Sequence, residues 1–339
     1  MAGWKLKNGE LINDRCSEEE YWRLFNYVFS KRCHKRNTYK FALIKSLLDN
    51  LLNSVQTEIG FSISFYDLFL KFTQCYWNLV LKHHLRQMRR QNDVSESAIE
   101  KILNEYAAKN TSPLDITLLE FSSLSEKEKN KLVSKVKPVC KQYVLGALFE
   151  DFEGEVFGFE TNEEELFLSY GAYDFMLKFK PELEKLNYYC WAQFLESVNE
   201  ESQVVRLLDK LEESIPQRQN LSIYRQILYE EFEQNNCFYC GKKLDQKIAV
   251  DHFIPWNFTK EDKIWNFVLA CPSCNSKKLD RLVEKEYIRK IDVRNRRLRA
   301  FRAKVVKDDF LSYHDGLIDD MWLYARNSGY KEIEVANCS

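Results

Sequence analysis

The sequence is poor in the residues that interrupt regular secondary structure. Only 10 of its 339 residues are glycine and 6 are proline, which argues against a loop-rich all-β protein and favours a mainly α fold. The nearest candidate for a membrane span, residues 66–84, contains Asp67, Lys71 and Lys82, whereas a span needs ~18–20 apolar residues. The first residues also lack an apolar segment of the signal-peptide type. The sequence therefore predicts a cytoplasmic protein with no membrane partner.

Several other motifs are missing. There is no Walker-type phosphate loop, no G-x-G-x-x-G and no serine elbow, so the chain does not encode energy-coupled translocation. Six of the 10 cysteines are scattered. In a reducing cytosol they are expected to be small core residues or surface thiols rather than disulfides.

Helical periodicity dominates the first part of the chain. Helices are expected over residues 38–52, from 66 to about 91, over 95–109 and from 125 to about 149, and Ser17 and Ser125 each open a capping-box pattern. Gly154 and Gly158 indicate a turn or a short strand pair. Pro216 marks the best interdomain break. We therefore predict a helical domain over 1–215, a small zinc-stabilised module over 216–285 and a basic helical C-terminal extension over 286–339.

The formal net charge of −1 conceals a basic region. Residues 234–307 contain 18 lysines and arginines against 8 aspartates and glutamates, so this region carries +10 and the rest of the chain −11. A concentrated basic region is the electrostatic footprint expected for a polyphosphate ligand.

The most informative segment lies within that region. Two C-x-x-C pairs, Cys237 with Cys240 and Cys271 with Cys274, have the spacing of a closed four-thiolate zinc site. Such a site stabilises a small fold but leaves no coordination position open for catalysis. Any chemistry must therefore come from the residues between the pairs.

Those residues include an acid, an imidazole and two amides. Residues 248–254 and 265–270 are expected to be strands, with a helix beginning at Pro272. This order places Asp251 and His252 at the end of the first strand, where Asn275 can converge on them from the helix. Phosphodiester cleavage needs an activated water and a cation that neutralises charge, and these residue types can supply both. The combination predicts a metal-assisted hydrolase that acts on nucleic acid.

This segment resembles an HNH (ββα-metal) endonuclease of the four-cysteine type. The resemblance covers about 45 residues and implies that His252 is the general base, while Asp251 and Asn275 hold one Mg²⁺ or Mn²⁺. It further implies that Asn266 supports the loop that orients His252 and that Lys278, or its rival Lys277, lies near a phosphate. The chain departs from many family members because Asn275 stands where they have histidine. An amide oxygen remains suitable for a hard cation, so a shifted metal preference is expected.

Several basic side chains follow the predicted catalytic helix. A DNA-contact role is predicted for Lys277, Lys278, Arg289, Arg294, Arg296 and Arg297, with a solvated charged face as the alternative. The basic sequence KRCHKR at 31–36 is interpreted as a charged turn between helices, although it could also contact phosphate.

Three functions remain open. The long helical region resembles the front part of bacterial stand-alone HNH proteins, some of which belong to phage-defence or restriction systems, so a DNA endonuclease in defence or restriction is the first. A mobile-element or homing nuclease is the second, and a non-catalytic zinc-dependent DNA-binding scaffold is the third. Double-stranded DNA is the expected substrate. The helical domain is expected to recognise DNA, to bind a regulatory protein or to form a homodimer.

Overall fold

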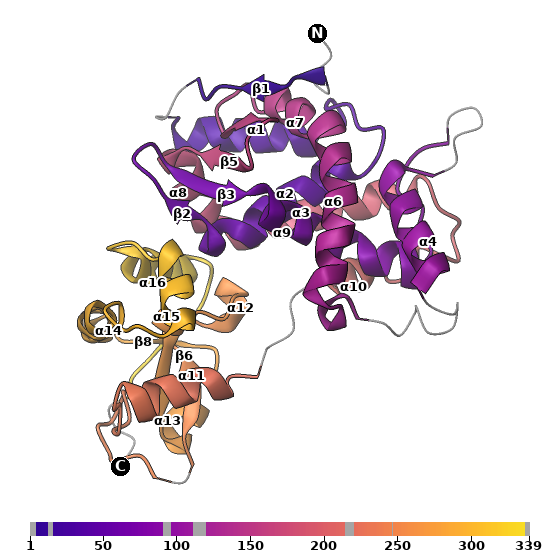
Figure 1. The fold of residues 1–339 in the computed structure, drawn as a ribbon. Helices are drawn as coiled ribbons and strands as arrows, with labels where there is room; N and C mark the ends of the chain where they lie inside the picture. Colours follow the sequence, from indigo (N-terminus) through magenta and orange to yellow (C-terminus); the bar gives the residue numbers. More distant parts are fainter. Residues whose placement is uncertain are drawn as a thin grey trace. The chain divides into compact units, whose positions relative to one another are not determined.

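A computed structural model describes residues 5–12, 16–90, 96–110, 120–213, 220–245 and 247–335. The chain forms two compact units, Met1–Met176 with Glu182–Ile215 and Leu177–Pro181 with Pro216–Ser339 (Figure 1). Helices account for most of the regular structure, which confirms the predicted mainly α fold. Within the described ranges, no helix is both long enough and apolar enough to cross a membrane.

The first unit consists mainly of helices around an aromatic core. Its α-helices, two of which reach the segment 177–181, are α1 (Glu18–Phe29), α2 (Tyr39–Asn50), α3 (Phe65–Trp77), α4 (Ala98–Asn110), α6 (Glu126–Tyr143), α7 (Leu145–Asp151), α8 (Tyr170–Lys178), α9 (Lys180–Glu196) and α10 (Leu207–Glu212). Shorter turns are η2 (Leu51–Asn53), η3 (Asn78–Lys82) and η4 (Phe121–Ser123). The side chains of Trp77 and Trp191 are almost completely buried.

Both predicted capping boxes are present. The Ser17 hydroxyl accepts a hydrogen bond from the amide of Glu20, whose carboxylate accepts one from the Ser17 amide, and Ser125 and Glu128 repeat this exchange. Each box satisfies amides that have no acceptor within the first turn. The starts of α1 and α6 are therefore determined locally.

The prediction of one long helix from residue 66 to about 91 is wrong. Helix α3 ends at Trp77, the π-helical turn η3 follows, and His84 has a φ of 51°. After this left-handed residue the chain is fixed by a distant side chain. The Asn199 side chain accepts from the Arg86 amide at 2.7 Å and donates to the Arg86 carbonyl at 2.9 Å. These tertiary hydrogen bonds replace the helical ones.

The helix predicted from 125 to about 149 is also interrupted. It divides into α6 and α7 at Val144, whose φ is −124°. This change of direction lets α7 bury Leu145 and Leu148.

A five-stranded antiparallel sheet accompanies these helices. Its order is β1 (Asn8–Gly9), β4 (Phe157–Glu160), β5 (Glu165–Leu168), β3 (Phe61–Ser64) and β2 (Val55–Gln56). The sequence predicted at most a turn or a strand pair near Gly158. The other strands are two to four residues long and come from distant segments. Such short strands show too little alternation of apolar and polar residues to be predicted from the sequence.

The second unit has the predicted order of strand, strand and helix. It contains α11 (Ser222–Gln226), η5 (Ile227–Glu231), β6 (Ala249–His252), α12 (Trp256–Thr259), η6 (Ile264–Asn266), β7 (Phe267–Ala270), α13 (Pro272–Lys278), β8 (Leu282–Val283), α14 (Glu286–Leu298), α15 (Lys304–Asp309), η7 (Phe310–Ser312), α16 (Leu317–Asn327) and β9 (Glu332–Ile333). Strands β6 and β7 pair antiparallel, with Asp251 opposite Val268 and His252 opposite Phe267.

The C-terminal helices share a core with this hairpin. Strand β9 pairs parallel with β8, the short strand that follows α13 in the chain. The Trp322 indole donates to the Val283 carbonyl at 2.8 Å, and Ile291, Leu298 and Met321 are fully buried. Residues far beyond the cysteine pairs therefore contribute to the packing of the unit that contains them.

Candidate active site and zinc centre

The four paired cysteines come together as one cluster. Their sulfur atoms all lie within 4.8 Å of one another, and the sulfurs of Cys240 and Cys271 are 3.8 Å apart. A tetrahedral zinc site with Zn–S bonds of about 2.3 Å has sulfur–sulfur edges of about 3.8 Å. The cluster therefore fits a structural zinc ion held by Cys237, Cys240, Cys271 and Cys274.

Local backbone structure positions these ligands. Gly241 has a φ of 73°, so the chain can reverse after Cys240, and its amide donates to the Cys237 carbonyl at 2.9 Å. Cys271 caps the start of α13. Burial disfavours the Cys237 thiolate, but backbone hydrogen bonds from Cys271, Cys240 and Tyr239 outweigh it and lower the pKa of Cys237. A lowered pKa favours the thiolate that binds metal.

The imidazole of His252 lies at the end of β6 and is nearly buried. Its Nε2 lies 2.8 Å from Oδ1 of Asp262, and its ring packs edge-on against Phe267. A carboxylate accepts hydrogen bonds, so the neutral ring donates Nε2–H to Asp262 and keeps a lone pair on Nδ1. The contact with Asp262 therefore fixes the orientation of Nδ1, the nitrogen that can accept a proton.

Asp251 has two hydrogen-bond donors on one of its two carboxylate oxygens. Oδ2 accepts from the Tyr239 hydroxyl and lies 3.2 Å from the Lys278 ammonium. Among the described residues, Oδ1 receives no hydrogen bond. The Asp251 carboxylate is therefore held in place and keeps one oxygen for another ligand.

Comparison with known families confirms the resemblance predicted from the sequence. Residues 237–281 match the family model of the HNH endonuclease. They form an HNH endonuclease domain. No curated protein and no solved structure matches the chain.

Asn266 holds the backbone that follows His252 in the HNH domain. The Asn266 side chain accepts from the Ile254 amide at 2.8 Å and donates to the Ile254 carbonyl at 2.9 Å. Its own carbonyl accepts from the Phe253 amide at 2.7 Å. Asn266 thus fixes the two residues that follow His252 in the sequence.

A hard cation could be held by Asp251 and Asn275. Asn275 lies on α13, which packs against β6, and its half-buried side chain has no hydrogen-bond partner among the described residues. A free carboxylate oxygen and a free amide oxygen are ligands that Mg²⁺ and Mn²⁺ accept, with water filling the other positions. The Lys278 ammonium lies at the other oxygen of Asp251, so it does not occupy Oδ1.

The structure places Lys278 in the interior rather than on a DNA-facing surface. Its side chain is fully buried, and its ammonium donates to the His252 carbonyl at 2.7 Å. Because this group connects the backbone of His252 with the carboxylate of Asp251, it positions both residues. The DNA contact predicted for Lys278 does not fit this burial.

Arg294 is the second basic residue whose predicted role needs correction. It is only 8% exposed and donates to the carbonyls of Phe267 and Trp265 at 2.6 and 3.0 Å. These bonds anchor α14 to the second strand of the hairpin. The other predicted DNA-contact residues lie nearer solvent: Lys277 is half-buried, and Arg289, Arg296 and Arg297 are exposed.

Sequence reasoning missed Asp262 and Tyr239. Asp262 lies in the connection between the strands, where it and Glu261 are the only acids. A search of that connection for a partner to His252 could have found it. Tyr239 lies inside the first cysteine pair, where its contact with Asp251 depends entirely on the folded hairpin.

Proposed function

We propose that the HNH domain hydrolyses phosphodiester bonds of double-stranded DNA, with His252 as the general base. The family match implies nuclease activity. The observation that supports the residue assignment is the contact between His252 and Asp262. It leaves the other nitrogen of a nearly buried imidazole in a fixed orientation, with its lone pair able to accept a proton.

The chemistry follows from these groups. Nδ1 of His252 takes a proton from a water molecule while the water oxygen forms a bond to phosphorus. The bond from phosphorus to the 3′ oxygen breaks, and the 3′ alkoxide takes a proton from solvent water, which leaves a 3′ hydroxyl and a 5′ phosphate. Asp262 stabilises the imidazolium that forms, because its carboxylate already accepts Nε2–H.

Asp251 and Asn275 would hold one Mg²⁺ or Mn²⁺. When bound, this ion stabilises negative charge on the scissile phosphate and the leaving oxygen. Tyr239 and Lys278 keep the Asp251 carboxylate in one orientation, and Asn266 keeps the backbone after His252 in place. The zinc cluster contributes folding energy rather than chemistry.

The exposed arginines of α14 are proposed to contact the DNA backbone. Arg289, Arg296 and Arg297 project from the helix that Arg294 anchors to the hairpin. Contacts of this kind supply affinity that falls with increasing salt and carry no base specificity. Lys277 is proposed as a fourth contact on α13.

A nicking assay on supercoiled plasmid tests this function. We expect the wild-type chain to cut with Mg²⁺ or Mn²⁺ and to stop when EDTA is added. His252→Ala should lower the rate by about 100-fold or more, since general-base catalysis contributes roughly 10²–10⁴-fold. His84→Ala changes an exposed histidine of the first unit and serves as the matched control. Wild-type cutting by His252→Ala, with its zinc content intact, would refute the assignment.

We propose a role in phage defence or restriction only because the helical region resembles the front part of bacterial stand-alone HNH proteins. One HNH site cuts one strand per event. Double-strand cleavage would therefore need a homodimer or two successive nicks.

A further inference from the structure

The first unit contains a cavity that is separate from the HNH domain. Its volume is 530 Å³, which lies within the range of about 300–1,000 Å³ that is typical of small-molecule sites. One wall is the loop that joins α1 to α2, with His34, Lys35 and Arg36. The rest of the lining includes Met88, Tyr143 and neighbouring apolar residues.

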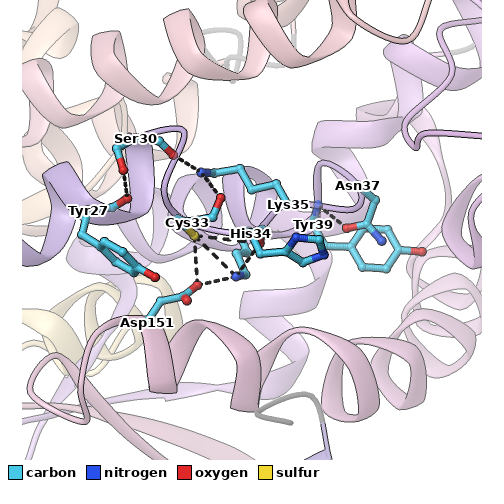
Figure 2. Close-up of polar contacts among 9 residues, drawn as sticks. Tyr27, Ser30, Cys33, His34, Lys35, Asn37, Tyr39 and Asp151 are labelled. Atoms are coloured by element: carbon cyan, nitrogen blue, oxygen red, sulfur yellow. Dashed lines mark hydrogen bonds and ion pairs between the residues drawn. The ribbon is translucent and has the colours of Figure 1, made fainter.

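The basic loop is held rigidly from within (Figure 2). Lys35 Nζ donates to the Ser30 carbonyl at 2.9 Å, and Lys40 Nζ donates to the His34 carbonyl at 3.0 Å and pairs with Asp151. The Cys33 thiol donates to the same aspartate at 3.3 Å. The loop backbone is therefore fixed before any ligand arrives, which reduces the entropy lost on binding.

The positive charge on this wall is largely uncompensated. Asp151 neutralises Lys40, whereas Lys35 donates to the carbonyl oxygens of Ser30 and Cys33 and its ammonium lies 5.6 Å from the centre of the Phe41 ring. The side chains of His34 and Arg36 are exposed and form no ion pair within the described part of the chain. Among the described residues that line the cavity, Glu96 carries the only carboxylate, and it accepts a hydrogen bond from Asn104 at 3.1 Å. The loop thus offers cationic donors suited to phosphate.

The other residues that line the cavity are mostly apolar or aromatic. Val144 and Met88 are buried, Ala147 is small, and the ring of Tyr143 is 44% exposed. An exposed aromatic ring beside apolar side chains offers a surface on which a planar base can stack. We propose that this cavity binds a free nucleotide, with the phosphates on Arg36 and His34 and the base against Tyr143.

Calorimetric titration of the full chain tests this proposal. The probes are ATP, GTP, CTP and UTP in separate titrations, with inorganic triphosphate and the four nucleosides as comparisons. We expect at least one nucleotide to bind at one site, and its nucleoside and triphosphate alone to bind at least about tenfold more weakly. Absence of binding by all four nucleotides would overturn the proposal, as would triphosphate binding as tightly as the best nucleotide.

Matched variants locate the site. The double variant His34→Gln, Arg36→Gln should weaken nucleotide binding by about tenfold or more, because it removes two charged donors. Tyr143→Leu should weaken nucleotide binding while leaving triphosphate binding unchanged. Arg32→Gln changes an exposed arginine of the same loop that does not line the cavity, and it should bind as the wild type does. Unaltered affinity in the double variant would overturn the assignment.

Two further measurements separate loss of the nucleotide site from loss of the fold and from binding of DNA. Neither His34 nor Arg36 has a side-chain hydrogen bond within the described residues, so the thermal midpoint should not change in the double variant. Binding of a duplex is measured with His252→Ala, which keeps the DNA intact. If the double variant loses duplex binding and no nucleotide binds, the loop contacts DNA and the proposal is wrong. Plasmid cleavage plays no part in these readouts, so failure of the nuclease assignment remains distinguishable.

Discussion

Nε2 of His252 and Oδ1 of Asp262 lie 2.8 Å apart, and both side chains are nearly buried. His252 ends the first strand of the hairpin, and Asp262 lies in the connection to the second strand. Their contact selects which imidazole nitrogen carries the proton, and so it determines where a base can act.

Replacing Asp262 with asparagine should impair catalysis without unfolding the HNH domain. The amide is nearly isosteric, but it can stabilise the wrong tautomer and cannot stabilise an imidazolium. We expect the single-turnover nicking rate to fall by about 10²–10⁴-fold, with the pH dependence of the rate also altered. Glu261→Gln, at the neighbouring acid, is the control. A merely structural role for Asp262 would change thermal stability and leave the pH profile of the remaining activity unaltered.

Loss of zinc should unfold the second unit. Metal binding supplies much of the folding free energy of small zinc modules. Cys274→Ser should therefore abolish stoichiometric zinc and lower the stability of that unit by several kcal/mol. Zinc content and thermal unfolding are the measurements. Cys190→Ser, a half-buried cysteine of the first unit, should retain one zinc per chain; equal zinc loss in both variants would contradict the assignment.

Replacing Arg294 should destabilise the fold more than it weakens DNA binding. Burial lowers the pKa of Arg294 to about 9, and its guanidinium satisfies the carbonyls of Phe267 and Trp265. Arg294→Met removes the guanidinium donor from the Phe267 carbonyl and leaves the Trp265 carbonyl with the Asn295 amide alone, which should cost about 1–3 kcal/mol or more. Denaturant unfolding measures this loss. The exposed Arg296→Met should show the reverse pattern, with near-normal stability and a reduced salt dependence of DNA binding.

Leu279 should tolerate glycine better than alanine. It follows α13 with φ 52° and ψ −126°, a backbone conformation in which a Cβ atom is sterically unfavourable. Its side chain is 63% exposed. Leu279→Gly should stabilise the second unit by about 1 kcal/mol because it relieves backbone strain while removing little buried surface. Leu279→Ala retains the Cβ atom and should change stability by less than about 0.5 kcal/mol. Thermal unfolding of both variants checks the difference.

Asp309 should make the stability of the second unit depend on pH. Burial raises the pKa of Asp309 to about 6, against about 3.9 in an unfolded chain. Between these values the folded chain retains a proton that the unfolded chain releases. The free energy of unfolding should therefore fall as the pH rises from about 4 to about 6, by up to about 3 kcal/mol.

Asp309→Asn should flatten this dependence. The amide oxygen can still accept the hydrogen bond from the Ile264 amide, which the carboxylate accepts at 2.7 Å. The measurement is the denaturation midpoint of the second unit at several pH values. Asp308→Asn, at the exposed neighbour, should keep the wild-type slope. An unchanged slope in Asp309→Asn would exclude this carboxyl as the cause.

Short-range patterns predicted much of the architecture. The capping boxes of Ser17 and Ser125 involve residues three apart, so α1 and α6 begin where expected. The end of α3 could not be predicted in this way, because the Asn199 side chain, 113 residues away, binds the backbone of Arg86. The five-stranded sheet was missed for the same reason, since β3 and β5 are strands of four residues that pair across a long stretch of chain.

The sequence by itself determined the zinc ligands and the imidazole, because the spacing of Cys237, Cys240, Cys271 and Cys274 limits what the segment between them can form. Only the tertiary structure decided what surrounds that imidazole. It placed Asp262 within hydrogen-bond distance of His252, buried the Lys278 ammonium beside the Asp251 carboxylate and buried the Arg294 guanidinium against the Phe267 carbonyl. Burial and long-range pairing depend on how separate elements pack, and the composition of a single segment does not encode that packing.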